Sequence, residues 1–276
     1  MTSRALFTVE RALEAGESSG LILGLDTGGP AAEIALVESG RVLADIACPA
    51  VSHGAQVADA VGSAMRGAGF EFRDLKAIAV GIGPGSFTGL RIGLSYAKGI
   101  VLGTGCALIG VPSFDSLAIA AVESDRVQSG DTICCVLDAR RGEVFSALYR
   151  VGPDGVEKVS DERADALEDL VERLEPGVLL AGDGKAREAL TLFSKLGSRG
   201  RAARLAQPEA KGKVIAALGA AWFVRGESDD PMIVQPLYVR PAEAAFKAAS
   251  PNLRSEERWR SGKNSSFANT PRTTTN

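Results

Sequence analysis

Histidine is nearly absent from this sequence of 276 residues, which contains only His53. Metal sites and catalytic dyads that use imidazole need a second strong partner. No serine or cysteine lies in a recognisable nucleophile elbow. The sequence therefore does not favour a metalloprotease or a histidine-dependent hydrolase, and we expect His53 to serve in a loop or as a helix cap.

Cysteine is scarce, and its spacing gives no redox or zinc motif. None of the four cysteines forms a C-x-x-C pair, and one histidine does not complete a common zinc ligand set. We predict no metal site and a cytoplasmic protein with reduced core cysteines at Cys48, Cys106, Cys134 and Cys135.

The sequence also lacks long apolar runs and a surplus of positive charge. No uninterrupted apolar stretch approaches the roughly 20 residues of a membrane span. Residues 1–20 have no apolar stretch of signal-peptide length and are interpreted as an N-terminal extension, either amphipathic or the result of an upstream start site. The formal net charge of −3 makes unaided tRNA or DNA binding unfavourable. The polar tail 250–276 is predicted to be disordered.

The stretch from Ala77 to Gly103 organises the chain. An apolar strand at 77–82 ends at Gly83-Pro84-Gly85, and a long helix follows, capped by Ser86 or by Thr88. The turn lacks the Lys-Ser/Thr ending of a Walker motif. We therefore interpret it as a tight turn that docks the helix on the sheet.

Two helices carry more apolar surface than one sheet can cover. Polar side chains form a single stripe on each of them, and the rest of both surfaces is apolar or small. We therefore expect another chain to pack there. The helices are 55–68, with its stripe at Gln56, Asp59, Ser63 and Arg66, and 89–103, with its stripe at Arg91, Ser95 and Lys98.

The chain consists of two similar halves. Asp26 and Asp138 each end an apolar strand, and each is followed at the same offsets by Ala-Leu. These matched landmarks favour a duplicated βββαβα unit, an α/β fold of the actin-like ATPase (ASKHA, RNase H-like) class. We predict an N-terminal lobe at 21–123, a polar hinge at 123–130 and a C-terminal lobe at 131–241. The expected strands and helices are 21–25, 31–37, 42–48, 55–68, 77–82, 107–111, 113–122, 165–174, 178–181, 185–196 and 209–225.

The loop after the first strand of each lobe cradles phosphates in the actin-like fold. In the first loop Asp26 would orient a metal ion or water, and the backbone N–H groups of Thr27, Gly28 and Gly29 would face phosphate. The second loop, from Asp138 to Gly142, has bulky side chains where close approach of phosphate favours glycine. We interpret the pair as a vestigial nucleotide loop. The alternative is an ATP-dependent kinase or ATPase that acts through Asp26 and Asp138.

Several of these segments together resemble the TsaB (YeaZ-like) family, a bacterial subunit required to make N6-threonylcarbamoyladenosine beside the tRNA anticodon. The resemblance covers about 21–240. It is carried by LGLDT at 23–27, GIGPGSFTGLRIG at 81–93, IGV at 109–111, DAR and GEV at 138–144, and PLYVR at 236–240.

The resemblance implies a paralogue of TsaD, the subunit that transfers the threonylcarbamoyl group. TsaD-type proteins hold a metal with two histidines four apart on the helix after the IGV-like strand. In this chain that register gives Ser113 and Leu117, which cannot replace imidazole. The implied role is a non-catalytic subunit that dimerises with a TsaD-type transferase, is joined by a TsaE-type ATPase and reaches tRNA only through the complex. No cofactor is implied beyond weak or shared ATP or ADP binding.

The resemblance places the partner on helices 55–68 and 89–103, the two with surplus apolar surface. We expect the isolated chain to pair with itself through the same patch. The expected interface residues are Val57, Ala60, Val61, Ala64, Met65, Gly89, Arg91, Gly93, Leu94, Ala97 and Lys98.

Overall fold

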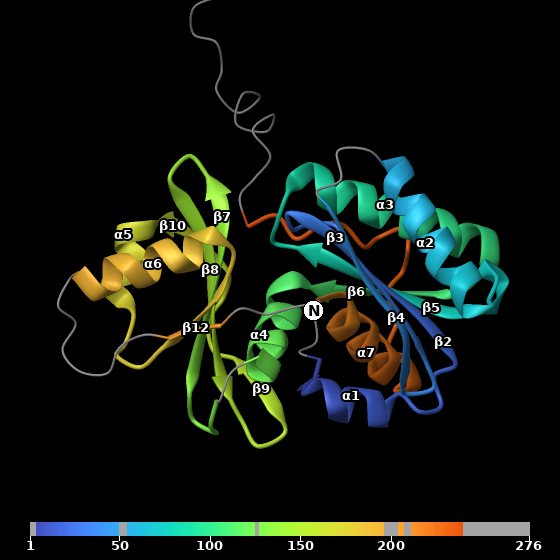
Figure 1. Ribbon diagram of the computed structural model, residues 1–276, viewed down its shortest axis with the longest axis horizontal. Coiled ribbons are helices and arrows are strands. Elements are labelled where there is room, and N and C mark those ends of the chain that lie inside the picture. Colours follow the sequence, from blue (N-terminus) through green and yellow to red (C-terminus); the bar gives the residue numbers. More distant parts are fainter. Residues whose placement is uncertain (1–3, 50–53, 125–126, 196–203, 207–210, 240–276) are drawn as a thin grey trace, which may run out of the picture. The chain divides into compact units, whose positions relative to one another are not determined.

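The computed structural model describes residues 4–49, 54–124, 127–195, 204–206 and 211–239, and these residues form two mixed sheets (Figure 1). The first sheet has the strand order β4-β3-β2-β5-β6. Strand β2 pairs antiparallel with β3 and parallel with β5. The strands are β2 (Leu21–Asp26), β3 (Ala31–Glu38), β4 (Arg41–Pro49), β5 (Leu75–Gly83) and β6 (Ala107–Pro112).

The second sheet repeats this arrangement as β9-β8-β7-β11-β12, with β1 beyond β9 and β10 beside β8. Strand β7 pairs antiparallel with β8 and parallel with β11, as β2 does with its neighbours. The shared order of five strands confirms the predicted duplication and the actin-like fold class. The strands are β1 (Leu6–Phe7), β7 (Thr132–Arg140), β8 (Glu143–Val151), β9 (Gly155–Lys158), β10 (Arg163–Ala166), β11 (Leu179–Gly182) and β12 (Arg204–Ala206).

Helices cover both faces of the first sheet, which explains why all six residues of β2 are buried. Leu23 and Leu25 point toward α2 (Gly54–Ala68) and α3 (Phe87–Thr104), and Ile22, with the opposite orientation, packs with α7 (Lys211–Val224). On the second sheet, Val136 and Leu180 pack with helices α5 (Leu167–Arg173) and α6 (Gly184–Lys195).

Helix α7 lies against the first sheet, so the sequence-based division into lobes at 21–123 and 131–241 needs a correction. Gly24 allows the close approach, because a Cβ atom there would lie 2.6 Å from the Gly212 carbonyl oxygen. The described residues up to Val239 form one compact unit. The last helix of the C-terminal half is therefore part of the N-terminal half's packing.

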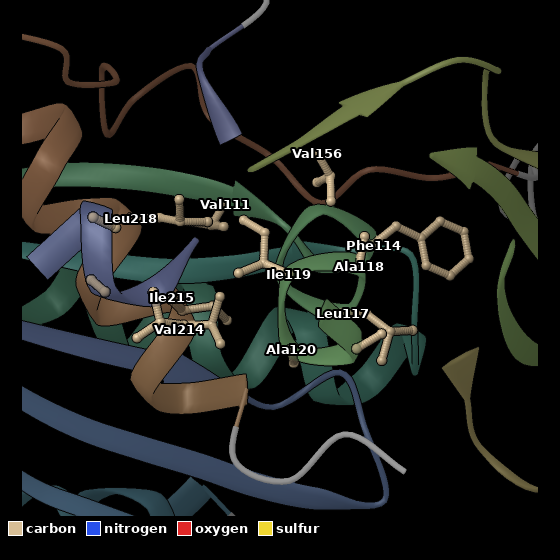
Figure 2. Packing of buried hydrophobic residues seen from close by; sticks show 14 of the residues in the cluster. Val111, Phe114, Leu117, Ala118, Ile119, Ala120, Val156, Val214, Ile215 and Leu218 are labelled. Atoms are coloured by element: carbon tan, nitrogen blue, oxygen red, sulfur yellow. The ribbon is translucent and has the colours of Figure 1, made fainter. Parts of the chain in front are cut away.

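Helix α4 (Ser113–Ser124) packs against α7 and against strands of the second sheet. Figure 2 shows its side chains Phe114, Leu117 and Ile119 in one buried cluster with Val214 and Leu218 of α7. The main core is thus built from helices of both halves.

Residues 4–16 are integrated into the fold, which corrects their interpretation as a mere extension. Strand β1 pairs with β9, and helix α1 (Val9–Ala15) buries Val9 and Ala12. The Trp222 indole Nε1 donates a hydrogen bond of 2.9 Å to the Ala5 carbonyl. The sequence analysis predicted neither this helix nor its role in the core.

The remaining predictions have mixed outcomes. Ser86 is the N-cap of α3, and three of the four cysteines are buried, with Cys48 half-buried. The short strands β1, β9, β10 and β12 and the 3-10 turn at Phe72–Asp74 were not predicted. Within the described residues, no helix has the length and apolar character needed to cross a membrane. His53 and the tail 250–276 lie outside the described residues.

Candidate functional site

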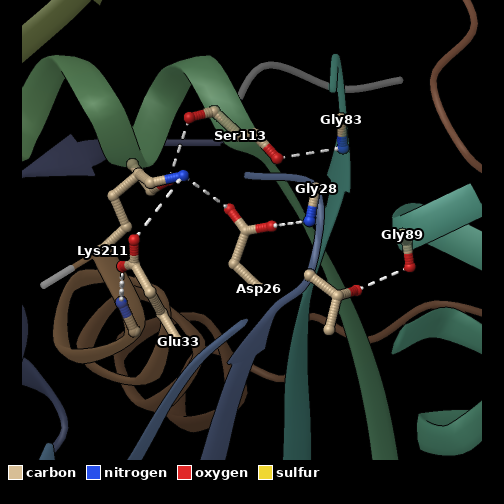
Figure 3. Close-up of polar contacts among 10 residues, drawn as sticks. Asp26, Gly28, Glu33, Gly83, Gly89, Ser113 and Lys211 are labelled. Atoms are coloured by element: carbon tan, nitrogen blue, oxygen red, sulfur yellow. Dashed lines mark hydrogen bonds and ion pairs between the residues drawn. The ribbon is translucent and has the colours of Figure 1, made fainter. Parts of the chain in front are cut away.

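Strand β2 ends in a buried carboxylate whose two oxygens are both engaged, and the first loop follows directly (Figure 3). Asp26 is only 1% exposed. Its Oδ1 accepts a hydrogen bond of 2.7 Å from the Gly28 N–H, and its Oδ2 lies 3.2 Å from the Lys211 ammonium. The sequence correctly placed Asp26 at the end of an apolar strand, but it did not predict a lysine beside it.

Lys211 stands at the start of α7, and its side chain is 12% exposed. The ammonium also lies 4.0 Å from Glu33 Oε1 on β3, and Glu33 Oε2 accepts a 3.0 Å hydrogen bond from the Gly212 N–H. Burial by itself lowers the pKa of Lys211, but the carboxylates of Asp26 and Glu33 outweigh that effect and raise it. Burial raises the pKa of Glu33. A protonated lysine therefore bridges one carboxylate at the end of β2 and one on β3.

Thr27 joins the loop to helix α3. Its Oγ1 donates a hydrogen bond of 2.8 Å to the Gly89 carbonyl. A Cβ atom at Gly93 would lie 2.2 Å from Thr27 Oγ1, and one at Gly89 would lie 2.0 Å from the Thr27 carbonyl oxygen. Contact with Thr27 within the chain thus explains the glycines at positions 89 and 93 of α3.

The backbone of Gly28 is occupied as well. Its N–H donates a hydrogen bond to Asp26 Oδ1, and its carbonyl accepts a 2.8 Å hydrogen bond from the Ser86 N–H. A metal-bound nucleotide would need free carboxylate oxygen and free N–H groups here. The donor set of this loop, with Lys211 in place, does not fit such a group. No three His, Cys, Asp or Glu side chains converge as metal ligands anywhere in the described residues.

Asp138 makes its contacts within the second half. Its Oδ1 accepts a 2.8 Å hydrogen bond from the Arg140 N–H, and its own N–H donates to Asp183 Oδ2 at 2.9 Å. Arg140 and Arg141 both adopt left-handed φ angles, 66° and 58°. Bulky residues thus form the tip of this hairpin, as the sequence indicated.

Most of the predicted interface side chains belong to the chain's own core. The apolar ones on α2 and α3 pack on the first sheet, so they cannot be contacts for another protein, and this corrects the expectation. Ala60 is half-buried. The buried residues are Val57, Val61, Ala64, Met65, Gly89, Gly93, Leu94 and Ala97.

The two predicted interface cations are tied to the segment that follows α7. Arg91 Nε donates a 2.9 Å hydrogen bond to the Tyr238 hydroxyl, and its guanidinium lies 3.8 Å from the Phe87 ring centroid. Lys98 Nζ donates to the Val234 carbonyl at 2.7 Å. The segment after α7 therefore covers part of the α3 surface that the sequence analysis had assigned to a partner.

Small residues line the side of α2 and α3 that points away from the sheet, here named the outer face and defined as Ser63, Gly67, Ser95, Gly99 and Gly103. All five are exposed. Apart from the neighbouring residues and backbone of its own helix, no atom of the described residues lies within 4 Å of a Cβ atom built at Gly67, Gly99 or Gly103. Leu102 beside it is 74% exposed. Sequence reasoning overlooked this face because its residues are neither large nor apolar.

The register that would carry metal-binding histidines in TsaD-type proteins is filled by two buried residues. Ser113 Oγ accepts a 3.1 Å hydrogen bond from the Gly83 N–H, and Leu117 packs in the main core. Between them Asp115 accepts a hydrogen bond from Tyr149. These contacts attach α4 to the rest of the fold, and neither of the two positions carries a histidine that could bind a metal.

The chain is similar to proteins of known family. Residues 48–216 match a family model described as TsaD, tRNA N6-adenosine threonylcarbamoyltransferase. The tRNA threonylcarbamoyladenosine biosynthesis protein TsaB of Bacillus subtilis is 31% identical over 231 residues, which cover 82% of this chain and 96% of that protein. The Escherichia coli TsaB is 34% identical over 135 residues, 49% of this chain and 57% of that protein.

Among solved structures, YeaZ from Pseudomonas aeruginosa matches with a TM-score of 0.64 and 24% identity, over 79% of this chain and 99% of that one. This likeness concerns the fold. Together with the extent of the match to the Bacillus subtilis protein, it answers the question of family: the chain belongs to the TsaB (YeaZ) family.

Proposed function

We propose that this chain is a non-catalytic cytoplasmic subunit in the synthesis of tRNA N6-threonylcarbamoyladenosine, and that it binds and supports a TsaD-type transferase. The similarity to tRNA threonylcarbamoyladenosine biosynthesis proteins of Escherichia coli and Bacillus subtilis supports the pathway. The match of residues 48–216 to the transferase family model supports a paired relationship between the two kinds of subunit.

The observation that carries the proposed partner surface is the outer face. Glycine within a helix costs about 1 kcal/mol relative to alanine. At Gly89 and Gly93 the close contact with Thr27 requires glycine. Among the described residues, Gly99 and Gly103 instead face open space. Small exposed residues on two neighbouring helices allow the backbone of another helix to approach closely. A partner helix packed on this face would explain why glycine occurs at positions 99 and 103 despite its cost to the helix.

A non-catalytic role is supported by the first loop. The Asp26 carboxylate is bound by Lys211 and Gly28, and Asp138 is bound within its own hairpin. In the kinase or ATPase alternative, Asp26 has to hold a metal ion or a water. The contacts of both its oxygens with Lys211 and Gly28 disfavour that alternative. We propose no nucleotide chemistry by this chain alone, and at most weak or shared ATP or ADP binding in the complex.

The rest of the assembly follows from the same proposal. A TsaE-type ATPase joins the pair, and tRNA is reached only through the complex, because a chain of net charge −3 has little affinity for a polyanion by itself. The isolated chain pairs with itself through the outer face.

Co-purification with a TsaD-type transferase tests the proposal. Ser95→Arg and Gly99→Arg place a long cation on the outer face without entering the core, so both should keep the fold and lose at least about tenfold of the retained partner. The matched control is Ser194→Arg on α6, another exposed helical serine, which should co-purify as the wild type does. Normal retention of the partner by both outer-face variants would contradict the assignment.

A further inference from the structure

Lys211 holds a position that a soluble protein seldom gives to a lysine. Its ammonium lies 3.2 Å from Asp26 Oδ2 and 4.0 Å from Glu33 Oε1, and the side chain is 12% exposed. Asp26 is 1% exposed and the Glu33 side chain 15% exposed. Two largely buried carboxylates from adjacent strands therefore face one positive charge that is delivered by a helix 185 residues further along the chain.

The two carboxylates have the character of a magnesium or manganese site. Magnesium in proteins is commonly held by one or two carboxylates and several waters. Asp26 stands at the end of the first strand, where the actin-like fold brings phosphates and their metal. Figure 3 shows the ammonium on the side of Asp26 that faces Glu33, between the two acidic side chains.

From these contacts we infer that Lys211 is a built-in counter-ion that takes the place of a divalent cation between Asp26 and Glu33 and keeps the first loop closed to metal-bound nucleotides. The inference extends the proposed function, because it gives a physical reason why this subunit carries no metal-nucleotide chemistry. It concerns the isolated chain, so it can fail while the partner proposal stands, and the reverse.

The local structure supports a filled site over an incidental ion pair. Glu33 is held in place by the Gly212 N–H, and the other Asp26 oxygen is held by the Gly28 N–H. Both acidic groups are thus oriented by the backbone, as metal-binding carboxylates are by their surroundings. Lys213, two residues further on α7, interacts instead with Asp45. Of the two lysines in this helix turn, Lys211 is therefore the one that pairs with Asp26 and Glu33.

The test is manganese binding by the isolated chain with Lys211→Ala. Removing a unit charge that lies within 4.0 Å of both carboxylates should lower the Mn²⁺ dissociation constant at least about tenfold relative to the wild type, measured by electron paramagnetic resonance of free Mn²⁺. Lys213→Ala is the matched control and should bind as the wild type does. The double variant Lys211→Ala/Asp26→Asn should lose the gain.

Stability provides a second measurement, because Lys211→Ala leaves two buried carboxylates without a counter-ion. Its thermal midpoint should fall and should recover on addition of millimolar Mn²⁺, and a variant that is unfolded without metal should refold by circular dichroism when Mn²⁺ is added. The inference is overturned if Lys211→Ala neither binds Mn²⁺ more tightly than the wild type nor recovers stability with it. It is equally overturned if the double variant keeps the gain.

Discussion

The Tyr149 hydroxyl on β8 donates a 2.6 Å hydrogen bond to Asp115 Oδ1 on α4, and both side chains are buried. This bond joins a helix that follows the first sheet to a strand of the second. Burial raises the pKa of Asp115 to about 6, although the Tyr149 hydrogen bond works in the opposite direction. The carboxyl is therefore partly protonated near neutral pH.

Asp115 gives the protein a predicted pH dependence. Its folded-state pKa of about 6 lies above the ordinary aspartate value of 3.8, so the folded protein holds this proton more tightly than the unfolded chain does. The stabilisation is lost as pH rises through 6. From pH 4.5 to 7.5 the free energy of unfolding of wild type should fall by about 2 kcal/mol relative to Asp115→Asn. Urea unfolding across this range measures the difference. The control Asp169→Asn, changed at an exposed position on α5, keeps Asp115 and should therefore fall in parallel with the wild type. A parallel course of wild type and Asp115→Asn would contradict the assignment.

Leu94 and Leu102 lie on the same helix and should respond very differently to truncation. Leu94 is 4% exposed and packs on the sheet, whereas Leu102 is 74% exposed. Leu94→Ala should lower the free energy of unfolding by about 2–5 kcal/mol, and Leu102→Ala should change it by less than about 0.5 kcal/mol. Chemical denaturation of the isolated chain decides. Equal effects would mean that the two faces of α3 are assigned wrongly.

Gly93 and Gly99 form a second contrasting pair on α3. Alanine at Gly99 should stabilise the protein by about 0.5–1 kcal/mol, since it gains helix propensity and its Cβ meets open space. Alanine at Gly93 should be destabilising despite the same propensity gain, because its Cβ would lie 2.2 Å from Thr27 Oγ1. Thermal unfolding measures both. Stabilisation by Gly93→Ala would show that the loop and the helix are not in close contact.

Thiol reactivity should separate the cysteines by burial. Cys48 is half-buried, while Cys134 is fully buried and burial raises its pKa to about 12. A thiolate is the reactive form, so the three buried cysteines should react with a thiol reagent only after unfolding. Mass spectrometry after brief labelling should find one modified cysteine, Cys48. Rapid labelling of Cys134 in the native protein would contradict the core assignment.

Local patterns predicted much of the fold. The apolar run at β2, the turn after β5 and the Ser86 cap depend on neighbouring residues, and all three are found. Short strands such as β12 carry too few residues to show a period. The presence of Asp26 and Thr27 in one loop was also predictable, because they are adjacent in the chain.

Tertiary contacts account for what the sequence did not reveal. Lys211 reaches Asp26 from 185 residues away, and no local signal marks that pairing. The apolar surface of α3 left for a partner was overestimated because Gly89 and Gly93 pack against Thr27 and because Leu94 is buried on the sheet. A count of apolar positions cannot distinguish a face covered by the same chain from one left for a partner.

The central claim is that this chain contributes an interface and no chemistry. The most direct test is a reconstituted tRNA threonylcarbamoylation reaction with a TsaD-type transferase, a TsaE-type ATPase and this chain as wild type, Ser95→Arg or Asp138→Asn. The account predicts that Ser95→Arg lowers formation of the modified nucleoside at least about tenfold and that Asp138→Asn leaves it within about twofold. Loss of the product with Asp138→Asn, together with full activity of Ser95→Arg, would contradict it.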